Sequence, residues 1–170
     1  MSDSSASMRY LSSLPELEPL FQGADHMDVK TIESNKALRE FLAGLISYSP
    51  SWLQLLYRVR GMFVRLLGMR QEPMENPKLS PEEISFTPGD SFGFFTVTHG
   101  KEASFLAAMS EDKHLSAHIL IAAEPLENGL NRFYAGTVVR YKHWTGPVYF
   151  NIIRPFHHLV VHFMIRHAVA

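Results

Sequence analysis

Residues 145–170 decide the fold, and they read T-G-P-V-Y-F-N-I-I-R-P-F-H-H-L-V-V-H-F-M-I-R-H-A-V-A. Large apolar side chains recur here at the i, i+3, i+4, i+7 spacing of one helix face. They are Tyr149, Ile152, Ile153, Phe156, Leu159, Val160, Phe163 and Met164. We expect Thr145 to cap this helix, and Pro155 to bend it because proline cannot donate to the carbonyl of Asn151. A long helix with one apolar face needs a broad apolar surface to lie on.

The composition restricts the class of protein. A chain of 170 residues, 46% hydrophobic and 19% charged, is typical of one globular domain with a sizeable core. No cysteine is present, which excludes disulfides and thiol chemistry. The N-terminus lacks the apolar segment of a signal peptide, and no run of about 18 uncharged apolar residues occurs. We therefore expect a cytoplasmic protein without a membrane span.

The charged residues are distributed unevenly along the chain. No Asp or Glu follows Glu127, whereas five of the 16 basic residues do. Residues 1–127 therefore carry a formal charge of −6, from 11 basic and 17 acidic residues, and the remainder carries +5. Either the two parts pair within the fold, or the basic part forms a surface or pocket mouth for an anionic ligand or an acidic partner.

The first half of the chain predicts an arm, a strand and a pair of helices. Residues 1–22 should form a loosely attached N-terminal arm before a domain of residues 23–170. Weak alternation of apolar and polar residues predicts a first strand at residues 24–32. We expect Ser34 to cap the first helix, and a second, basic amphipathic helix to run over residues 51–70.

The second half predicts an antiparallel meander. Residues 71–91 read as an acidic, proline-rich surface linker. The hydrophobic period then changes to two, with a turn expected at His99-Gly100. Four strands are expected at residues 92–98, 102–109, 114–123 and 131–143. Turns at this regular spacing are typical of strands that pair with their sequence neighbours.

Alternation along the last two strands predicts which face is buried. On the third strand we expect a solvated face that carries His114, Ser116 and His118. On the fourth strand we expect Arg140 and Lys142 on the same convex, solvated face. The opposite, buried face should carry Leu115, Ala117, Ile119, Ile121, Phe133, Ala135, Thr137, Val139, Tyr141 and His143.

These elements together predict an α+β fold of the helix-grip type. An antiparallel sheet with one apolar face must cover that face, and the last helix is the only element long enough to do so. The sheet should curve around this C-terminal helix and leave a cavity between sheet, helix and helix pair.

Four short motifs resemble a bacterial family, the domain of unknown function numbered 2867. They are G-A-D-H-M-D at residues 23–28, R-G-M-F-V-R-L-L-G-M at 60–69, D-K-H-L-S-A-H at 112–118 and R-P-F-H-H-L-V at 154–160. The resemblance covers about residues 20–168, with the motifs in the family's order. One departure is that the family has an acidic residue and an arginine after H-L, where this chain has Ser116 and His118.

The resemblance implies a layout similar to the START-like (SRPBCC) superfamily. Proteins of that superfamily bind hydrophobic small molecules in a central cavity, and some are cyclases, aromatases or hydrolases. Some relatives of the family are fused to short-chain dehydrogenase-type domains, which implies a role beside a metabolic enzyme.

The best candidate for acid–base chemistry is His157, because an imidazole titrates near neutral pH. It follows Pro155, whose bend frees backbone carbonyls, so His157 could equally hold a structural hydrogen bond to one of them. Tyr141 or Tyr149 could act as its catalytic partner. We expect the structural role and keep the catalytic one as the alternative.

Aromatic residues gather at the turn into the last helix and are candidates for ligand contact. Arg154 lies about one and a half helical turns beyond Tyr149 and could pair with an anionic ligand head. The candidate ligand-binding set is Arg154, His157, Tyr149, Tyr141, His143, Trp144 and Phe133. Such aromatic residues more often simply close the core.

We expect neither a metal nor a cofactor. His158 and His162 have the spacing of a helical metal site, but no acidic residue lies near them in the sequence. No glycine-rich phosphate loop, nucleophile elbow or dinucleotide fingerprint is present. The basic residues follow no recognisable nucleic-acid scaffold, so nucleic acid is not an expected partner.

Three functions remain open from the sequence. The first is a binding module for a hydrophobic or amphipathic small molecule, anionic ones included, whose polar end Arg154 or His157 would meet. The second is a cyclase, aromatase or hydrolase that uses the same cavity. The third is an interaction module for a partner enzyme, and a homodimer is also an open expectation. If the ring of Phe156 packs on the sheet, Phe156→Ala should cost about 3–5 kcal/mol.

Overall fold

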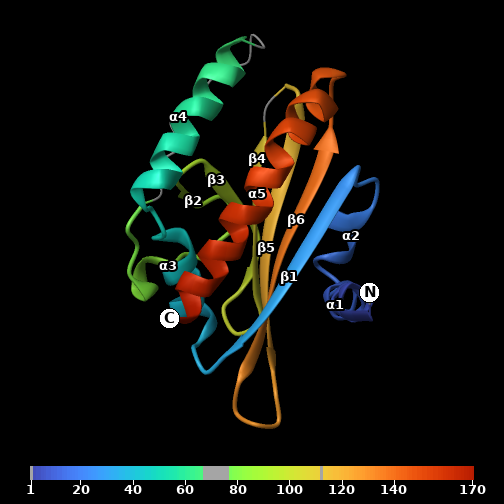
Figure 1. The fold of residues 1–170 in the computed structure, drawn as a ribbon. Helices are drawn as coiled ribbons and strands as arrows, with labels where there is room; N and C mark the ends of the chain where they lie inside the picture. Colours follow the sequence, from blue (N-terminus) through green and yellow to red (C-terminus); the bar gives the residue numbers. More distant parts are fainter. Residues whose placement is uncertain (1, 67–76, 112) are drawn as a thin grey trace.

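The computed structural model describes residues 2–66, 77–111 and 113–170 (Figure 1). It confirms the α+β fold, in which a curved antiparallel sheet grips a long C-terminal helix. The helix α5 (Thr145–Val169) lies diagonally across one face of the sheet, which we call the inner face. An N-terminal arm lies against the opposite, outer face (Figure 1).

Six strands form the sheet in the order β1-β6-β5-β4-β3-β2. The last five are a meander in which each strand pairs with its neighbour in sequence, and β1 pairs antiparallel with β6. The meander was predicted with four strands; the expected strand 92–98 is instead divided between β2 and β3. The strands are β1 (His26–Ser34), β2 (Ser91–Phe92), β3 (Phe95–Lys101), β4 (Phe105–Glu111), β5 (Leu115–Pro125) and β6 (Asn131–Tyr141).

The main core lies between the inner face, α3 (Leu38–Ile46) and the C-terminal half of α5. Phe41 of α3 stacks on Phe133 of β6 with ring centroids 4.1 Å apart, and neither ring is exposed. The helices α3 and α5 approach closely at Gly44, because a Cβ at that position would lie 2.9 Å from the Cα of Ala168. This end of the sheet is therefore tightly closed.

A second core lies on the outer face, where the sequence predicted solvent. The arm folds as α1 (Ser2–Ser12) and α2 (Glu18–Phe21), and it buries Leu11 and Leu17 completely against the sheet. His114, Ser116 and His118 are each only 5% exposed, so the prediction of a solvated face was wrong. The prediction failed for two reasons. The outer side of β4, β5 and β6 supplies the apolar surface that the arm's leucines need, and the turn into α5 encloses His114, whose Nδ1 contacts Thr145.

Polar contacts tie the arm down at several points. Arg140 donates to the backbone carbonyls of Pro19, Leu20 and Gln22, so its guanidinium holds the arm and does not simply face solvent. Tyr10 stacks on Tyr134 with centroids 4.7 Å apart. The arm is thus packed on the sheet by both apolar and polar contacts, which corrects the expectation of loose attachment.

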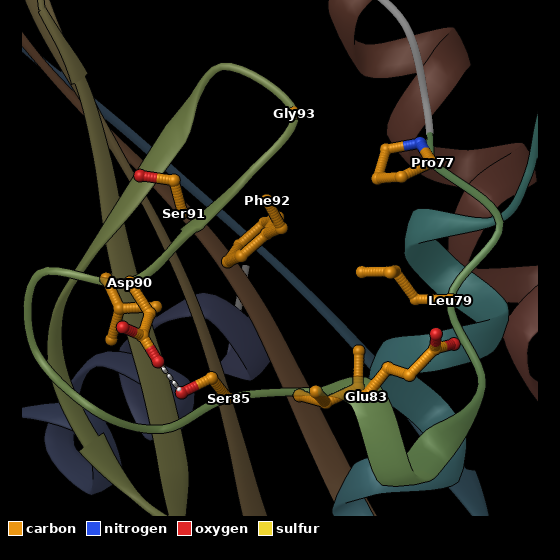
Figure 2. Close-up of a pocket in the computed structure, with 10 residues that line it drawn as sticks. Pro77, Leu79, Glu83, Ser85, Asp90, Ser91, Phe92 and Gly93 are labelled. Carbon is orange, nitrogen blue, oxygen red and sulfur yellow. Dashed lines mark hydrogen bonds between the residues drawn. The ribbon is translucent and has the colours of Figure 1, made fainter.

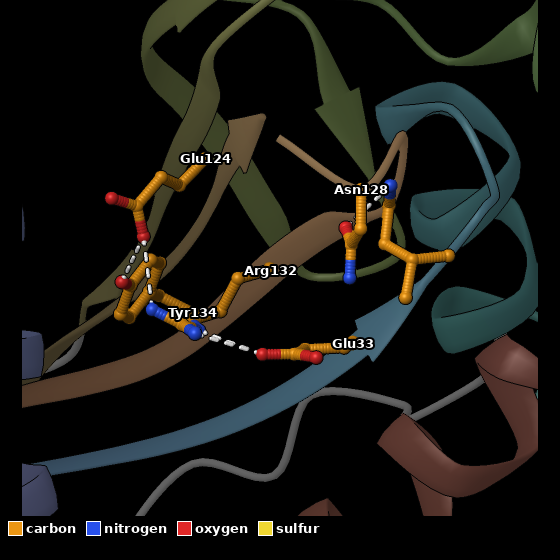
Figure 3. Close-up of polar contacts among 6 residues, drawn as sticks. Glu33, Glu124, Asn128, Arg132 and Tyr134 are labelled. Atoms are coloured by element: carbon orange, nitrogen blue, oxygen red, sulfur yellow. Dashed lines mark hydrogen bonds and ion pairs between the residues drawn. The ribbon is translucent and has the colours of Figure 1, made fainter. Parts of the chain in front are cut away.

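Tyr134 also belongs to a polar network that joins three strands (Figure 3). Its hydroxyl donates to Glu124 Oε2 at 2.5 Å, and Arg132 lies 3.5 Å from the same oxygen. Arg132 also donates to Glu33 of β1 at 2.8 Å. Burial and the Glu124 carboxylate raise the pKa of Tyr134 to about 12, so this hydroxyl stays protonated. The network stabilises the pairing of β1, β5 and β6.

Both predicted helix caps were wrong. Ser34 ends β1, and the cap of α3 is Ala37, whose N–H donates to Glu40 Oε2 at 2.8 Å. The N-cap of α5 is Trp144, without a side-chain cap hydrogen bond. The hydroxyl of Thr145 instead forms hydrogen bonds with ring nitrogens of two histidines. Polar residues near a helix start can cap it, but nearby partners compete for the same hydroxyl.

The predicted turn at His99-Gly100 is also wrong. These residues lie inside β3, next to a register shift between Val97 and His99. The chain turns after it, between Lys101 and Phe105, and an additional turn joins β2 to β3 at Gly93, which has a φ of 57°. Gly100 is a glycine for a different reason, since a Cβ there would lie 2.3 Å from the Phe86 carbonyl oxygen.

The second helix of the pair is α4 (Ser51–Leu66), and the predicted continuation to Arg70 lies outside the described residues. The first part of the predicted linker also lies outside the described residues, and its later part contains a 3-10 turn at Pro81–Glu83. Leu53 anchors the start of α4 in the core. From there α4 diverges from the sheet, beside α5 (Figure 1).

The helix α5 is confirmed, but its buried face differs from the predicted one. The side toward the sheet carries Phe150, His157, Ile165 and Ala168. Phe156 is 50% exposed, so the premise of the predicted cost of Phe156→Ala was wrong. The helix has apolar residues nearly all round, and the helical period alone could not determine which of them face the sheet.

Candidate functional site

The inner face is only partly covered at the end where α5 begins. Leu115, Ala117 and Ile119 of β5 point to the inner face, and all three are partly exposed. Their neighbours on β4 toward the same face include Ala108 and Ser110, which are small. This end therefore contrasts with the closed end beneath α3, where Ile121 and Ala123 are buried.

A group of titratable side chains borders this end, at the edge formed by β1, β6 and α5. His157 of α5 faces inward, and its Nε2 lies 3.1 Å from Thr137 Oγ1 of β6. Burial lowers the pKa of His157 to about 4, and the nearby His158 acts in the same direction. His157 is therefore neutral at physiological pH and joins helix to sheet, through a side chain and not through the expected backbone carbonyl.

The next residue of α5 pairs with β1. His158 Nδ1 lies 3.1 Å from Asp28 Oδ2, and both side chains are partly exposed. Asp28 also lies 3.5 Å from the ammonium of Lys30. A carboxylate on Nδ1 orients an imidazole and leaves its Nε2 for a proton transfer. This pair is the clearest acid–base unit on the inner side of the sheet.

Two more of the expected residues lie near this pair. Burial lowers the pKa of His26, and the charge of Arg154 lowers it further. Burial raises the pKa of Tyr141 and Asp25 adds to that rise, whereas the charge of Arg154 opposes it. His26 Nε2 is buried without a hydrogen-bond partner among the described residues. The edge thus carries several polar groups that converge from three elements.

Tyr149 has a separate setting, toward α4. It is 3% exposed, and Arg60 Nε donates to its hydroxyl at 2.5 Å. The guanidinium of Arg60 also lies over the Tyr149 ring, 5.6 Å from its centroid. Phe63 and Leu115 complete this cluster. Arg60 thus bridges α4 and α5.

Three expected ligand contacts are placed unfavourably. Phe133 is stacked in the closed core and exposes no surface to a ligand. Trp144 is 72% exposed at the start of α5. His143 is exposed, and its Nδ1 lies 2.9 Å from Thr145 Oγ1. The structure therefore brings together Arg154, His157 and Tyr141 but not the whole predicted set.

A pocket lies elsewhere, at the β2–β3 edge of the sheet (Figure 2). In Figure 2, Phe92 and Leu79 face each other across it, and Ser85 donates to Asp90 below them. Its volume is about 160 Å³, smaller than the roughly 300 Å³ at which ligand pockets begin. Its apolar lining adjoins the main core, so we interpret it as an incompletely filled rim of that core.

Two searches of the described residues, 2–66, 77–111 and 113–170, gave negative results. No group of three or more potential metal ligands of the His, Cys, Asp or Glu type was found there. Within the same ranges, no helix has the length and apolar character needed to cross a bilayer.

Sequence reasoning missed Asp28, His26 and His158 as members of one group. Two of the motifs quoted above supply them, because G-A-D-H-M-D contains His26 and Asp28, and R-P-F-H-H-L-V contains His158. The motifs lie 130 residues apart, and only the pairing of β1 with β6 beneath α5 brings them together. The resemblance of both motifs to one family was the one indication in the sequence that they belong together.

Comparison with protein-family models gives a match over residues 20–164, to proteins of unknown function with the label DUF2867. The chain belongs to this family. The match spans most of the chain and includes both halves of the Asp28–His158 pair. A comparison of the DUF2867 chain with curated proteins found no significant match.

Proposed function

We propose that this DUF2867 protein is a binding domain for a hydrophobic or amphipathic small molecule, held between the inner face of the sheet, α4 and α5. The observation that carries the proposal is the partly exposed apolar strip Leu115, Ala117 and Ile119, next to a closed and well-packed core. Water-exposed apolar surface on the concave side of a sheet is costly unless a ligand covers it. Kinship with the START-like superfamily would agree with this function.

The polar edge supports an amphipathic ligand with an anionic end. Arg154 is exposed and its charge acts on both His26 and Tyr141, so a carboxylate or phosphate bound beside Arg154 would meet a guanidinium. His157 is a poorer contact, because Thr137 already occupies its Nε2. The preferred ligand therefore has an apolar body and a small anionic head.

Native mass spectrometry of protein purified from its natural host tests the proposal. We expect a bound apolar or amphipathic molecule that is released on denaturation. Ala117→Trp should reduce its occupancy about tenfold or more, because the indole fills the space and overpacking costs at least 1–2 kcal/mol. Met27→Trp is the matched control, since Met27 is 43% exposed on the outer face.

Equal occupancy in Ala117→Trp and wild type would contradict this location of the ligand. A protein that is consistently empty when purified from its host would contradict the function itself.

A second candidate, an enzyme of the hydrolase or cyclase type, rests on the Asp28–His158 pair. The originally expected catalytic set of His157 with Tyr141 or Tyr149 is less suited, because His157 contacts Thr137 and the Tyr149 hydroxyl accepts from Arg60. His158 could instead act as a general base on a bound water or substrate, oriented by Asp28.

A screen of p-nitrophenyl esters of increasing chain length would test this candidate. Activity that Asp28→Asn and His158→Gln both reduce at least about 100-fold would support general-base catalysis. Activity that survives in both variants would exclude this pair as its source.

A further inference from the structure

The side of α5 away from the sheet carries an exposed apolar stripe, and so does α4. On α5 the stripe consists of Val148, Ile152, Phe156, Leu159 and Phe163, each between 42% and 50% exposed. On α4 it consists of Leu55, Val59, Met62 and Leu66, each between 56% and 84% exposed. Both stripes follow helical spacing, so each forms one continuous face of its helix.

The two stripes form one surface, which we call the α4–α5 apolar face. Trp52 of α4 contacts Phe163 of α5 edge-to-face, with ring centroids 5.6 Å apart, and this contact joins the stripes at one end. The helices also meet toward the other end, where Arg60 and Phe63 of α4 contact Tyr149 of α5, and both lie on the same side of the sheet (Figure 1). Exposed apolar surface of this extent on adjacent helices is typical of an interaction site.

The charges of the two helices are of one sign. The segments of α4 and α5 contain five arginines and no Asp or Glu. Since the whole chain has a formal charge of −1, the remaining segments carry −6. Arg58 and Arg65 are exposed on α4, as is Arg166 on α5. The molecule is thus electrically asymmetric, and a negatively charged surface would attract it with these helices foremost.

This pattern of charge selects among the occupants of the surface. A second copy of the chain would bring the same arginines against these, at a cost in repulsion. A bilayer of anionic lipids offers negative headgroups to the arginines and an apolar layer to the leucines and aromatic rings, and it requires no complementary shape. We infer that the α4–α5 apolar face docks on the surface of an anionic lipid bilayer, without spanning it.

Docking in this way does not depend on the proposed ligand, because the stripe lies on the far side of α5 from the inner face of the sheet. A negative result for one of the two proposals therefore leaves the other standing.

The test of docking is flotation of the purified full chain with vesicles of phosphatidylcholine alone or of phosphatidylcholine mixed with phosphatidylserine.

We expect binding to the mixed vesicles, weaker binding at about 1 M salt, and little binding to phosphatidylcholine alone. Each arginine near an anionic surface contributes roughly fivefold to the partition coefficient, so the double variant Arg58→Gln/Arg65→Gln should bind about 25-fold more weakly. Leu159→Glu should also abolish most binding. Met27→Glu, an exposed apolar position on the other side of the sheet, is the control that should bind as wild type does.

Circular dichroism of each variant verifies that it is folded. Binding of wild type to neither kind of vesicle would overturn the inference, and so would equal binding to both kinds. A concentration-dependent dimer that Leu159→Glu disrupts, without vesicle binding, would assign the surface to a second copy instead. Loss of binding in Met27→Glu as large as in Leu159→Glu would show that this face is not the site.

Discussion

At the scale of single residues, burial determines what the inner histidines can do. His157 and His158 are neighbours in the sequence, yet His157 points between helix and sheet whereas His158 reaches the partly exposed Asp28. The two side chains leave the helix about 100° apart, so one of them can be enclosed while the other stays near solvent. The same dipeptide thereby provides a contact with Thr137 and an imidazole that is paired with a carboxylate.

The buried imidazole predicts a specific dependence of stability on pH. His157 has a pKa of about 4 in the folded protein, against about 6.5 in an unfolded chain. Between these values the unfolded chain binds more protons, so the free energy of unfolding should fall as the pH is lowered from about 6.5 to about 4. The contribution of His157 is about 3 kcal/mol, at 1.36 kcal/mol for each pKa unit.

His157→Gln removes this titration and keeps a group that can contact Thr137. Urea unfolding at several pH values gives the free energy of unfolding of wild type and His157→Gln as a function of pH. The two plots should run parallel above pH 7 and converge or cross toward pH 4. His26 and His118 also have lowered pKa values, but both proteins share them, so the difference isolates His157. Curves that stay parallel over the whole range would contradict the assignment.

At the scale of elements, α5 illustrates the limit of sequence patterns. The helix was predicted at Thr145, where it begins, and Pro155 lies inside it as expected. The pattern could not select the buried side, because Ile152, Phe156 and Leu159 are as apolar as the residues that do face the sheet. The surface of the sheet decides which side of α5 is buried, because β6 places Thr137 opposite His157.

Two phenylalanines of α5 give a matched test of that face. Phe150 is 4% exposed and packs beside His26 and Tyr141, whereas Phe156 is 50% exposed. Phe150→Ala should lower the free energy of unfolding by about 3–5 kcal/mol, and Phe156→Ala by about 1 kcal/mol or less. Equilibrium unfolding by denaturant measures both changes. The reverse order would mean that the helix is rotated about its axis.

At the scale of the whole molecule, the sheet has a core on each side. The helix pair, the closing helix and the order of the meander were predictable from periodicity, whereas the turn expected at His99-Gly100 was not where the chain reverses. The second core was not, because the arm's leucines and the outer residues of β4, β5 and β6 lie far apart in the sequence. For the same reason, the Asp28–His158 pair could not be deduced from spacing alone.

The outer core predicts that the arm contributes strongly to stability. Leu17 is completely buried there, so Leu17→Ala should cost about 2–5 kcal/mol. Leu159→Ala is the same substitution at a 47% exposed position and should cost less than about 1 kcal/mol. Thermal unfolding followed by circular dichroism compares the two. Near-equal, small effects would mean that the arm is only loosely attached.

The central claim is that the open end of the inner face binds an apolar molecule. Methyl-detected NMR of the labelled protein during titration with dodecanoate tests it most directly. We predict saturable shifts at the methyl groups of Ala117 and Ile119, and none at Ala107 and Val138 of the outer core. Unchanged Ala117 and Ile119 signals, or shifts confined to Leu55 and Leu159, would contradict the claim.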